Sequence, residues 1–341
     1  MDTFNKILFE HIDSLVNENP DLANDVDIEK AINNLIPEMT AVVKKSLIDS
    51  TNAMLREHRS LSGEFVARNI SRWAEAFDLL ETLIVICTDS GAEFNSSYRP
   101  QAASEDDLVF DLVVRHHARG CHIANEILCL LKNGFSDAAH ARWRALHEVA
   151  ATAMFIAKHG KECAERFYYH EVVDSYNGMV EHKKYEHRLQ AKGPTAEEVA
   201  ECKVQFDLLI KKYGKKYADN YGWASYLFPN HNKVGFGAIE KDVQLEHMRP
   251  YYKWASQNVH TGSKAMRNRL ALSETDEDIL LVGQSDSGMT DPAHATAISL
   301  TQITATLLFL KPTIDHVIIL EIIKDYSNEV GNTFLKIDKG N

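Results

Sequence analysis

The chain has 341 residues, 45% of them hydrophobic, which is enough apolar material for one large core or two smaller ones and excludes a disordered tail. Its formal net charge of −12 opposes generic binding to DNA or to anionic membranes, because phosphate binding needs a basic surface. The longest apolar run, near residues 307–323, is interrupted by charges, and the five cysteines form no CxxC pair. We therefore expect a cytoplasmic protein without a membrane span.

Apolar residues recur at helical spacing through most of the chain, and alternating runs of β-branched residues are nearly absent. This pattern predicts an all-α fold: a multi-helix bundle with an N-terminal helical extension and at most one short hairpin, near residues 279–282. The helices are expected near residues 3–17, 27–57, 62–88, 105–133, 136–159, 161–190, 195–217, 247–260 and 291–326.

Turn-forming and capping residues support these helix boundaries. Asn133 and Gly134 are typical of a helix end, and Ser136 with Asp137 can cap the helix that follows. The Gly193-Pro194-Thr195 run, with glutamates in the next turn, predicts another helix start.

The polar stretch 89–104 contains few large aliphatic residues and is the best candidate for a linker. It predicts two domains, an N-terminal helical region over residues 1–95 and a helical bundle over residues 105–330.

Several common catalytic signatures are absent from the sequence. It contains no phosphate loop, no GxGxxG after a strand, no complete HExxH and no GxSxG at a strand-to-helix turn. We therefore expect no cofactor and no resident metal.

Titratable side chains form a row on each of three consecutive predicted helices, which we call the polar seam. The rows consist of Arg115, Arg119, His122 and Glu126; of His140, Arg144 and His147; and of Arg166, His170, Asp174, Asn177 and Glu181. A solvated helix face is the alternative interpretation of each row.

Arg142 differs from its neighbours because it points into an alanine-rich face. An unpaired buried charge costs several kcal/mol, so we expect Arg142 to pair with a carboxylate such as Glu126 or Asp174. Residues 111–150 carry five basic and four acidic side chains together with five histidines, so this region is neutral to slightly positive inside an acidic protein. An anionic ligand would bind here.

Two Arg-x(4–6)-His spacings occur in the seam, from Arg142 to His147 and from Arg115 to His122. They resemble the signature of HEPN-type helical endoribonucleases. That resemblance implies that the arginine holds the scissile phosphate and the histidine handles the ribose 2′-OH proton without a metal.

A second resemblance covers about residues 105–265. The Arg144-x-x-x-Glu148 pair, followed by a run of small residues, and the later Ser256-x-x-x-His260 element resemble a bacterial helical domain family of unknown function. The resemblance implies an all-helical core and, through a distant kinship with HEPN toxins, a role in stress or phage defence.

The first functional hypothesis is a metal-independent endoribonuclease that acts on RNA. Its candidate catalytic residues are Arg142, Arg144, His147, Glu148 and His260. Candidate residues for binding RNA or a nucleotide are Arg115, Arg119, His122, Glu126, His170, Asp174 and Ser256. Ser256 and His260, four residues apart, can also be read as a nucleophile and its base.

Two further hypotheses remain open at this point. In one, the protein is a non-enzymatic sensor or interaction protein, the seam is a structural salt-bridge network, and an alanine face packs against a second subunit. That face consists of Ala139, Ala150, Ala153 and Ala157. In the other, the His122/Glu126 and His170/Asp174 pairs hold two metal ions in a helical bundle.

Overall fold

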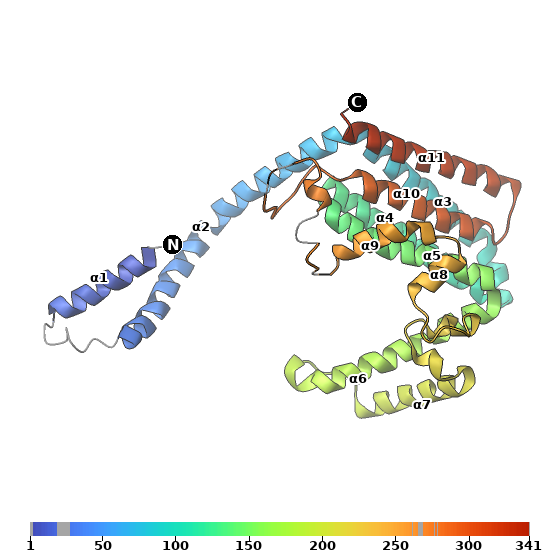
Figure 1. Ribbon diagram of the computed structural model, residues 1–341, viewed down its shortest axis with the longest axis horizontal. Coiled ribbons are helices and arrows are strands. Elements are labelled where there is room, and N and C mark those ends of the chain that lie inside the picture. Colours follow the sequence, from blue (N-terminus) through green and yellow to red (C-terminus); the bar gives the residue numbers. More distant parts are fainter. Residues whose placement is uncertain are drawn as a thin grey trace. The chain divides into compact units, whose positions relative to one another are not determined.

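The computed structural model describes residues 3–18, 28–260, 262–264, 269–275, 277 and 279–340, and within these ranges every regular element is a helix (Figure 1). The all-α prediction is confirmed. The α-helices are α1 (Thr3–Glu18), α2 (Ile28–Arg72), α3 (Ala74–Ser104), α4 (Leu108–Lys132), α5 (Ser136–Tyr169), α6 (Glu171–Leu189), α7 (Ala196–Tyr213), α8 (Phe236–Asp242), α9 (Arg249–Gln257), α10 (Thr290–Leu308) and α11 (Ile314–Asp338). Short 3-10 helices cover Lys215–Ala218, Gly222–Leu227, Glu246–Met248 and Leu270–Leu272.

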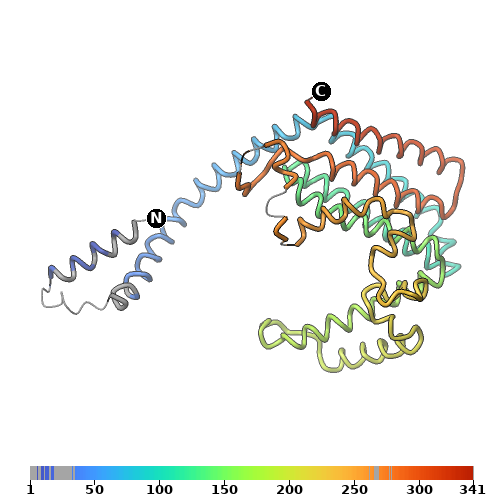
Figure 2. Tube along the Cα trace, in the orientation of Figure 1, coloured from blue at the N-terminus to red at the C-terminus, as the bar shows by residue number. Residues whose placement is uncertain are grey.

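The chain divides into two compact units, residues 1–65 and residues 66–341. The first contains α1 and most of α2. In the second, α4 packs along α5, α10 lies against both, and α3 and α11 complete the bundle, while α6 and α7 form a hairpin (Figure 2). No helix among the described residues is long and apolar enough to cross a membrane.

Small side chains on α5 allow the central helices to pack closely. Ala139, Ala150 and Ala153 are fully buried in the main core, and Trp143 on the same helix donates from Nε1 to Ser299 Oγ on α10 at 3.0 Å. The expectation that these alanines meet a second subunit is therefore wrong, because the bundle of the same chain already covers them.

Two of the predicted helix boundaries have the capping groups that the sequence indicated. Thr195 and Glu198 form a reciprocal capping box at the start of α7. Gly134 has a φ of 80°, which lets its N–H and that of Phe135 close the end of α4. The predicted cap of α5 is different: Asp137 Oδ1 accepts from the Leu270 N–H at 2.9 Å, which fastens a distant loop instead.

The predicted linker is the clearest error in the sequence interpretation. Residues 89–104 form the C-terminal half of α3, where Phe94 packs against Phe110 in a second core cluster. The predicted 291–326 helix is two helices separated near Pro312, and Thr313 caps the second. Residues 279–282, the candidate hairpin, form an exposed loop.

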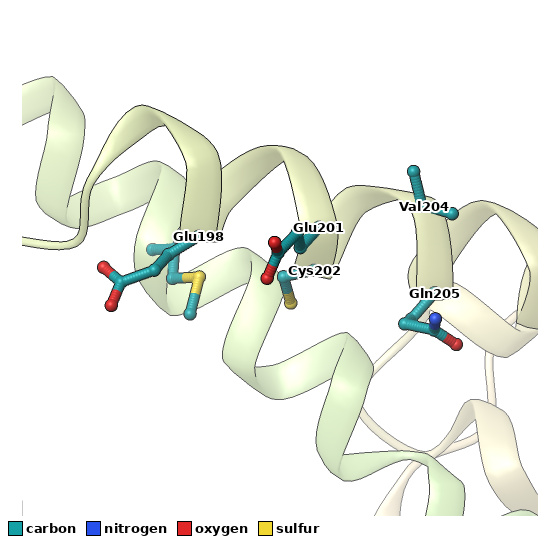
Figure 3. Close-up of a pocket in the computed structure, with 6 residues that line it drawn as sticks. Glu198, Glu201, Cys202, Val204 and Gln205 are labelled. Carbon is teal, nitrogen blue, oxygen red and sulfur yellow. The ribbon is translucent and has the colours of Figure 1, made fainter.

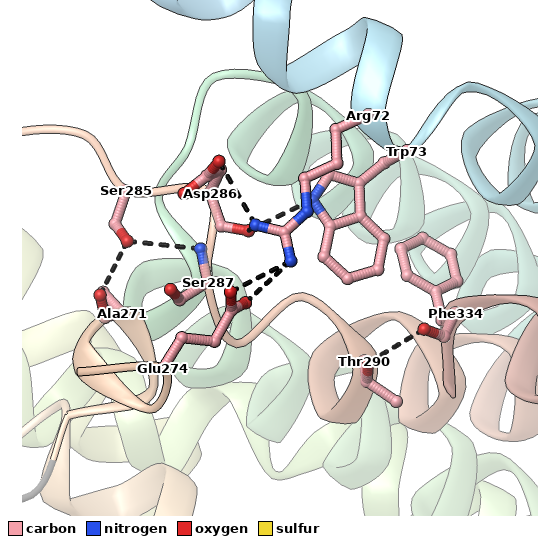
Figure 4. A network of polar contacts seen from close by, with 9 residues as sticks. All are labelled: Arg72, Trp73, Ala271, Glu274, Ser285, Asp286, Ser287, Thr290 and Phe334. Atoms are coloured by element: carbon pink, nitrogen blue, oxygen red, sulfur yellow. Dashed lines mark hydrogen bonds and ion pairs between the residues drawn. The ribbon is translucent and has the colours of Figure 1, made fainter. Parts of the chain in front are cut away.

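A polar cluster fastens the loop before α10 to the start of the bundle (Figure 4). The Arg72 guanidinium donates to both carboxylate oxygens of Glu274 at 3.0 Å and lies 3.2 Å from Asp286 Oδ2. Trp73 Nε1 donates to the Asp286 carbonyl, and the Trp73 ring stacks on Phe334 of α11 at 5.4 Å. The loop is thus tied to a fully buried aromatic pair.

Replacing Gly91→Ala should lower the free energy of unfolding by about 1–3 kcal/mol, because the new side chain overpacks the core. A Cβ at Gly91 would lie 2.2 Å from His117 Cε1, and the displaced ring would lose its 3.1 Å hydrogen bond to Thr304 Oγ1. Urea unfolding measures the change. Gly178→Ala on α6, where a Cβ has nothing within 4 Å, is the control and should be stabilising by about 0.5–1 kcal/mol. Equal effects at the two positions would contradict the packing argument.

Candidate functional site

The rows of the polar seam on α4 and α5 meet at an ion pair. The Arg142 guanidinium pairs with Glu126 Oε2, which confirms one of the two predicted partners, and His122 Nε2 lies 3.4 Å from the other oxygen of the same carboxylate. Both members of the Arg142–Glu126 pair are partly exposed. The arginine therefore reaches the edge of the alanine-rich face and is neutralised there.

A second cluster joins the two motifs that carry the family resemblance. Arg144 Nη2 lies 3.2 Å from Glu148 Oε1 on α5, and the Tyr252 hydroxyl of α9 donates to that same oxygen. The Arg144 guanidinium carbon also lies 4.8 Å from the centroid of the Tyr252 ring. The Arg144/Glu148 helix and the Tyr252/Ser256 helix are thus in direct contact.

A buried carboxylate lies beneath this contact. His147 Nε2 donates to Glu240 Oε1 of α8 at 2.9 Å, and both side chains are 0% exposed. The second oxygen of Glu240 pairs with the guanidinium of Arg249, at the first residue of α9. We call these six side chains the α5–α9 network: Arg144, His147, Glu148, Glu240, Arg249 and Tyr252.

Burial governs the electrostatics of the α5–α9 network. It lowers the pKa of His147 below its ordinary value, although the Glu240 carboxylate acts in the opposite direction. Burial and the bond to Glu148 raise the pKa of the Tyr252 hydroxyl. Burial would lower the pKa of Arg144, but pairing with Tyr252 and Glu148 raises it above its usual value. At neutral pH the network therefore contains a neutral imidazole, a neutral phenol and permanently charged arginines.

His140, one turn before Arg144 in the same row, lies in an aromatic enclosure. Its ring stacks on Trp143 at 5.5 Å and meets the Trp254 ring edge-on at 5.3 Å. Neither ring nitrogen has a hydrogen-bond partner among the described protein atoms, and burial lowers the pKa of His140 to about 4. This histidine stays neutral and acts as a flat core side chain.

The remaining predicted catalytic residues do not join the network. His260 is exposed beyond the end of α9, whereas His147 is fully buried. Ser256 Oγ donates to the backbone carbonyl of Tyr252 at 2.7 Å, one helical turn back. The structure therefore places Ser256 in a helical backbone hydrogen bond and does not bring His260 to His147.

The candidate ligand-binding residues are also spread apart. Arg115 and Arg119 are exposed on α4, and Arg115 Nε donates to Asp111 at 2.7 Å. His170 is buried and donates from Nε2 to the backbone carbonyls of Tyr217 and Asp219, at 3.1 and 2.9 Å. Its row partner Asp174 is mostly exposed, 3.7 Å from Nδ1. Within the described ranges, no three histidine, cysteine or acidic side chains come together in a way that could hold a metal ion.

Sequence reasoning missed Glu240 and Arg249. Both lie in a stretch of short helices, where neither hydrophobic periodicity nor a motif distinguishes them from surface charges. The one local signal at Glu240 is its place next to Ile239 and four residues after Phe236, on the apolar side of a seven-residue helix. That signal is too weak to name a partner 93 residues away along the chain.

A separate groove lies on the α6–α7 hairpin, with a volume of about 560 Å³ (Figure 3). Its lining residues are Met179, Glu198, Glu201, Cys202, Val204 and Gln205. Helix α7 has no buried residue, and Val204 and Leu208 are largely exposed. The hairpin therefore presents an apolar groove with an acidic rim.

Stability should fall as the pH drops from about 6.5 to about 4, by roughly 1.4 kcal/mol per pH unit for each neutral buried histidine. His117 and His140 both have a pKa of about 4 through burial. In that window the unfolded chain binds protons that the folded chain does not, so the free energy of unfolding decreases with decreasing pH. Urea unfolding at several pH values measures the slope. His140→Phe should reduce the slope of the unfolding free energy against pH by the contribution of one histidine. His122→Ala, at an exposed position, should leave that slope unchanged. An unchanged slope in His140→Phe would contradict the assignment.

Comparison with known proteins gives one match. No curated protein and no solved structure matches the chain. One family model does match, over residues 110–278, a segment that contains Arg144, Glu148, Ser256 and His260. The predicted resemblance to a helical family of unknown function is thereby confirmed. The matching model is that of a family of unknown function, DUF5677, and residues 110–278 are similar to it.

Proposed function

We propose that the protein is a non-enzymatic helical interaction protein in which the polar seam is a structural network. The observation that carries this proposal is that the main side chains of the polar seam are already paired within the chain. Arg142 is paired with Glu126, Arg144 with Glu148, and the fully buried His147 with Glu240. These three side chains, which a ribonuclease would direct at RNA, are each already paired with a carboxylate of the same chain.

The position of His147 argues against proton transfer to a substrate. A general base must come within hydrogen-bond reach of the proton it removes. His147 is 0% exposed, and its Nε2–H is used by Glu240. RNA would reach this ring only after α8 and α9 had moved away from α5.

The arginines are also poorly suited to holding a phosphate. Glu126 and Glu148 neutralise Arg142 and Arg144, so a phosphate would have to displace a carboxylate at each arginine. It would also approach those carboxylates at close range, and like charges repel. A structural role needs none of these rearrangements.

The network has a clear structural purpose. Helices α8 and α9 are seven and nine residues long, and helices this short are marginal by themselves in water. Glu240 and Arg249 connect them to each other, and His147 and Tyr252 connect them to α5. These polar side chains therefore hold two short helices against a longer, more stable one.

The groove on α6–α7 supports a binding role. A helical hairpin with an open apolar groove can accept an amphipathic helix, and Glu198 and Glu201 on its rim favour a partner with basic residues beside its apolar face. The paired hydrophobic and charged contacts of such a complex need no catalytic group. This surface, not the seam, is where we place recognition.

Arg142→Gln separates the two functions most sharply. The Arg142–Glu126 pair is partly exposed, so its loss should cost no more than about 1 kcal/mol and leave the fold intact. Under our proposal, purified wild type and Arg142→Gln are equally inactive on single-stranded RNA in the presence of EDTA, and the two have equal effects on cell growth. Metal-independent cleavage by the wild type that Arg142→Gln abolishes would overturn the proposal and favour the endoribonuclease hypothesis.

His147→Ala tests the structural role directly. The change leaves one oxygen of the buried Glu240 without its hydrogen bond, while Arg249 still pairs with the other oxygen, and a buried acceptor left unsatisfied costs about 1–3 kcal/mol. We expect a clearly lower urea midpoint. His122→Ala, at an exposed position of the same seam, is the matched control and should leave the midpoint unchanged. A wild-type midpoint in His147→Ala would contradict the structural role.

A further inference from the structure

A pocket of about 260 Å³ lies at the start of α5, between the first turn of that helix and two segments of the loop that precedes α10. Its walls come from residues 134–138, from Arg269 and Ala271, and from residues 281–283. All of them belong to the unit formed by residues 66–341. The pocket is therefore built within one compact unit, and it shares no residue with the α5–α9 network or with the groove on α6–α7.

Hydrogen bonds hold both loop segments against the start of α5. The Ser285 N–H donates to the Gly134 carbonyl at 3.0 Å, and the Leu270 N–H donates to Asp137 Oδ1 at 2.9 Å. The two segments are also joined to each other, because Ser285 Oγ donates to the Ala271 carbonyl at 2.6 Å (Figure 4). The walls are thus held in place before a ligand binds, which lowers the entropic cost of binding.

The first turn of α5 has backbone donors without acceptors. The first four N–H groups of any α-helix lack a partner within the helix, and a polar side chain at the N-cap usually accepts from one of them. Here the N-cap residue is Phe135, which has no side-chain acceptor. Among the described residues, no acceptor bonds the N–H groups of Ser136, Asp137 and Ala138, and these three residues line the pocket.

The side chain of Ser136 is a second, independent sign of a ligand. Ser136 lines the pocket and is 0% exposed, and its Oγ has no hydrogen-bond partner in the part of the chain that the structure describes. Buried hydroxyl groups are nearly always hydrogen-bonded, because leaving one unpaired costs free energy. A ligand oxygen at the start of α5 would accept from this hydroxyl.

Two charged side chains line the described walls, and together they favour a singly charged anion. Arg269 Nη1 donates to the Leu281 carbonyl at 3.0 Å, and a guanidinium has further N–H donors for a ligand. Asp137 offsets the formal charge of Arg269, while the start of an α-helix adds roughly half a positive charge. The small positive balance suits a carboxylate better than a doubly charged phosphate.

The remaining walls are apolar and the pocket is small. Hydrocarbon surface comes from Phe135, Ala138, Ala271, Leu281 and Val282. Pockets for drug-sized ligands usually measure about 300–1,000 Å³, so a pocket of about 260 Å³ suits a smaller molecule. A short apolar tail attached to the carboxylate would cover these walls.

We propose that the start of α5 binds a small carboxylate with an apolar tail. The carboxylate accepts from the backbone N–H groups of the first helical turn, from Ser136 Oγ and from the Arg269 guanidinium. Its tail lies against Phe135 and Leu281. Unpaired N–H groups and the helix dipole make a helix start favourable for an anion. This site goes beyond the partner-helix groove proposed above and does not rest on it.

A titration of the full chain with hexanoate, followed by ligand-observed NMR, tests the site. We expect saturable binding with a dissociation constant on the order of 1 mM, as suits a ligand of this size. Hexanamide has the same tail without the charge, and inorganic phosphate has charge without a tail, so both should bind about tenfold more weakly or worse. No saturation by about 20 mM hexanoate, or equal binding of hexanoate and hexanamide, would overturn the proposal.

Two variants locate the site. Arg269→Gln removes a positive charge and Ser136→Ala removes only a hydroxyl, and each should weaken hexanoate binding by about tenfold. Arg188→Gln removes the same charge at an exposed position of α6 and should leave binding unchanged. Because Arg269 also holds Leu281, Ser136→Ala is the cleaner variant and should keep the wild-type urea midpoint. Wild-type affinity in Ser136→Ala, or equal weakening by Arg269→Gln and Arg188→Gln, would contradict the assignment.

A peptide distinguishes two sources of the carboxylate, a free acid and the end of a chain. The probe is an N-acetylated tetrapeptide that ends in leucine with a free carboxylate, and the same peptide with a C-terminal amide is its control. Tighter binding of the peptide acid than of hexanoate, weakened by Ser136→Ala, would assign the site to a chain end. Weaker binding of the peptide acid would assign it to a free acid, and equal binding of peptide acid and peptide amide would count against a carboxylate site.

Discussion

The buried carboxylate of Glu240 is the constraint on which the candidate site depends. A charge without access to water is tolerated only when its partners compensate for lost hydration. His147 and Arg249 supply that compensation from two different helices, one on each oxygen. Removing either partner would leave one buried oxygen of Glu240 without a hydrogen bond or ion pair. The three side chains therefore fix α5, α8 and α9 relative to one another.

This constraint explains why the seam looks catalytic in the sequence and closed in the structure. Arginine and histidine at short spacing suit phosphate chemistry, and they equally suit ion pairs and hydrogen bonds with carboxylates of the same chain. The two roles differ in whether a substrate can reach the side chains. Arg144 and Tyr252 lie over the buried pair, and the guanidinium carbons of Arg144 and Arg249 lie 4.8 and 4.9 Å from the centroid of the same tyrosine ring. The polar groups face one another and leave little to offer a substrate.

One exterior surface is apolar. The groove on α6–α7 exposes aliphatic side chains, and α7 has no buried residue of its own. In water such a surface is favourable only when it is covered. The molecule thus combines a polar interior network, which gives one defined arrangement of short helices, with an apolar exterior groove suited to another helix.

The sequence by itself determined the helices and many of their ends. Periodicity and caps act within a few residues, so the Thr195 cap and the turn at Gly134 could be predicted, as could the pairing of Arg142 with Glu126 across a helical hairpin. Tertiary structure decided the rest. Residues 89–104 are polar in composition, yet Phe94 finds a core and the segment stays helical. The partner of His147 is 93 residues away, because a buried charge is compensated by whichever group packing brings near it, and local pattern does not encode that proximity.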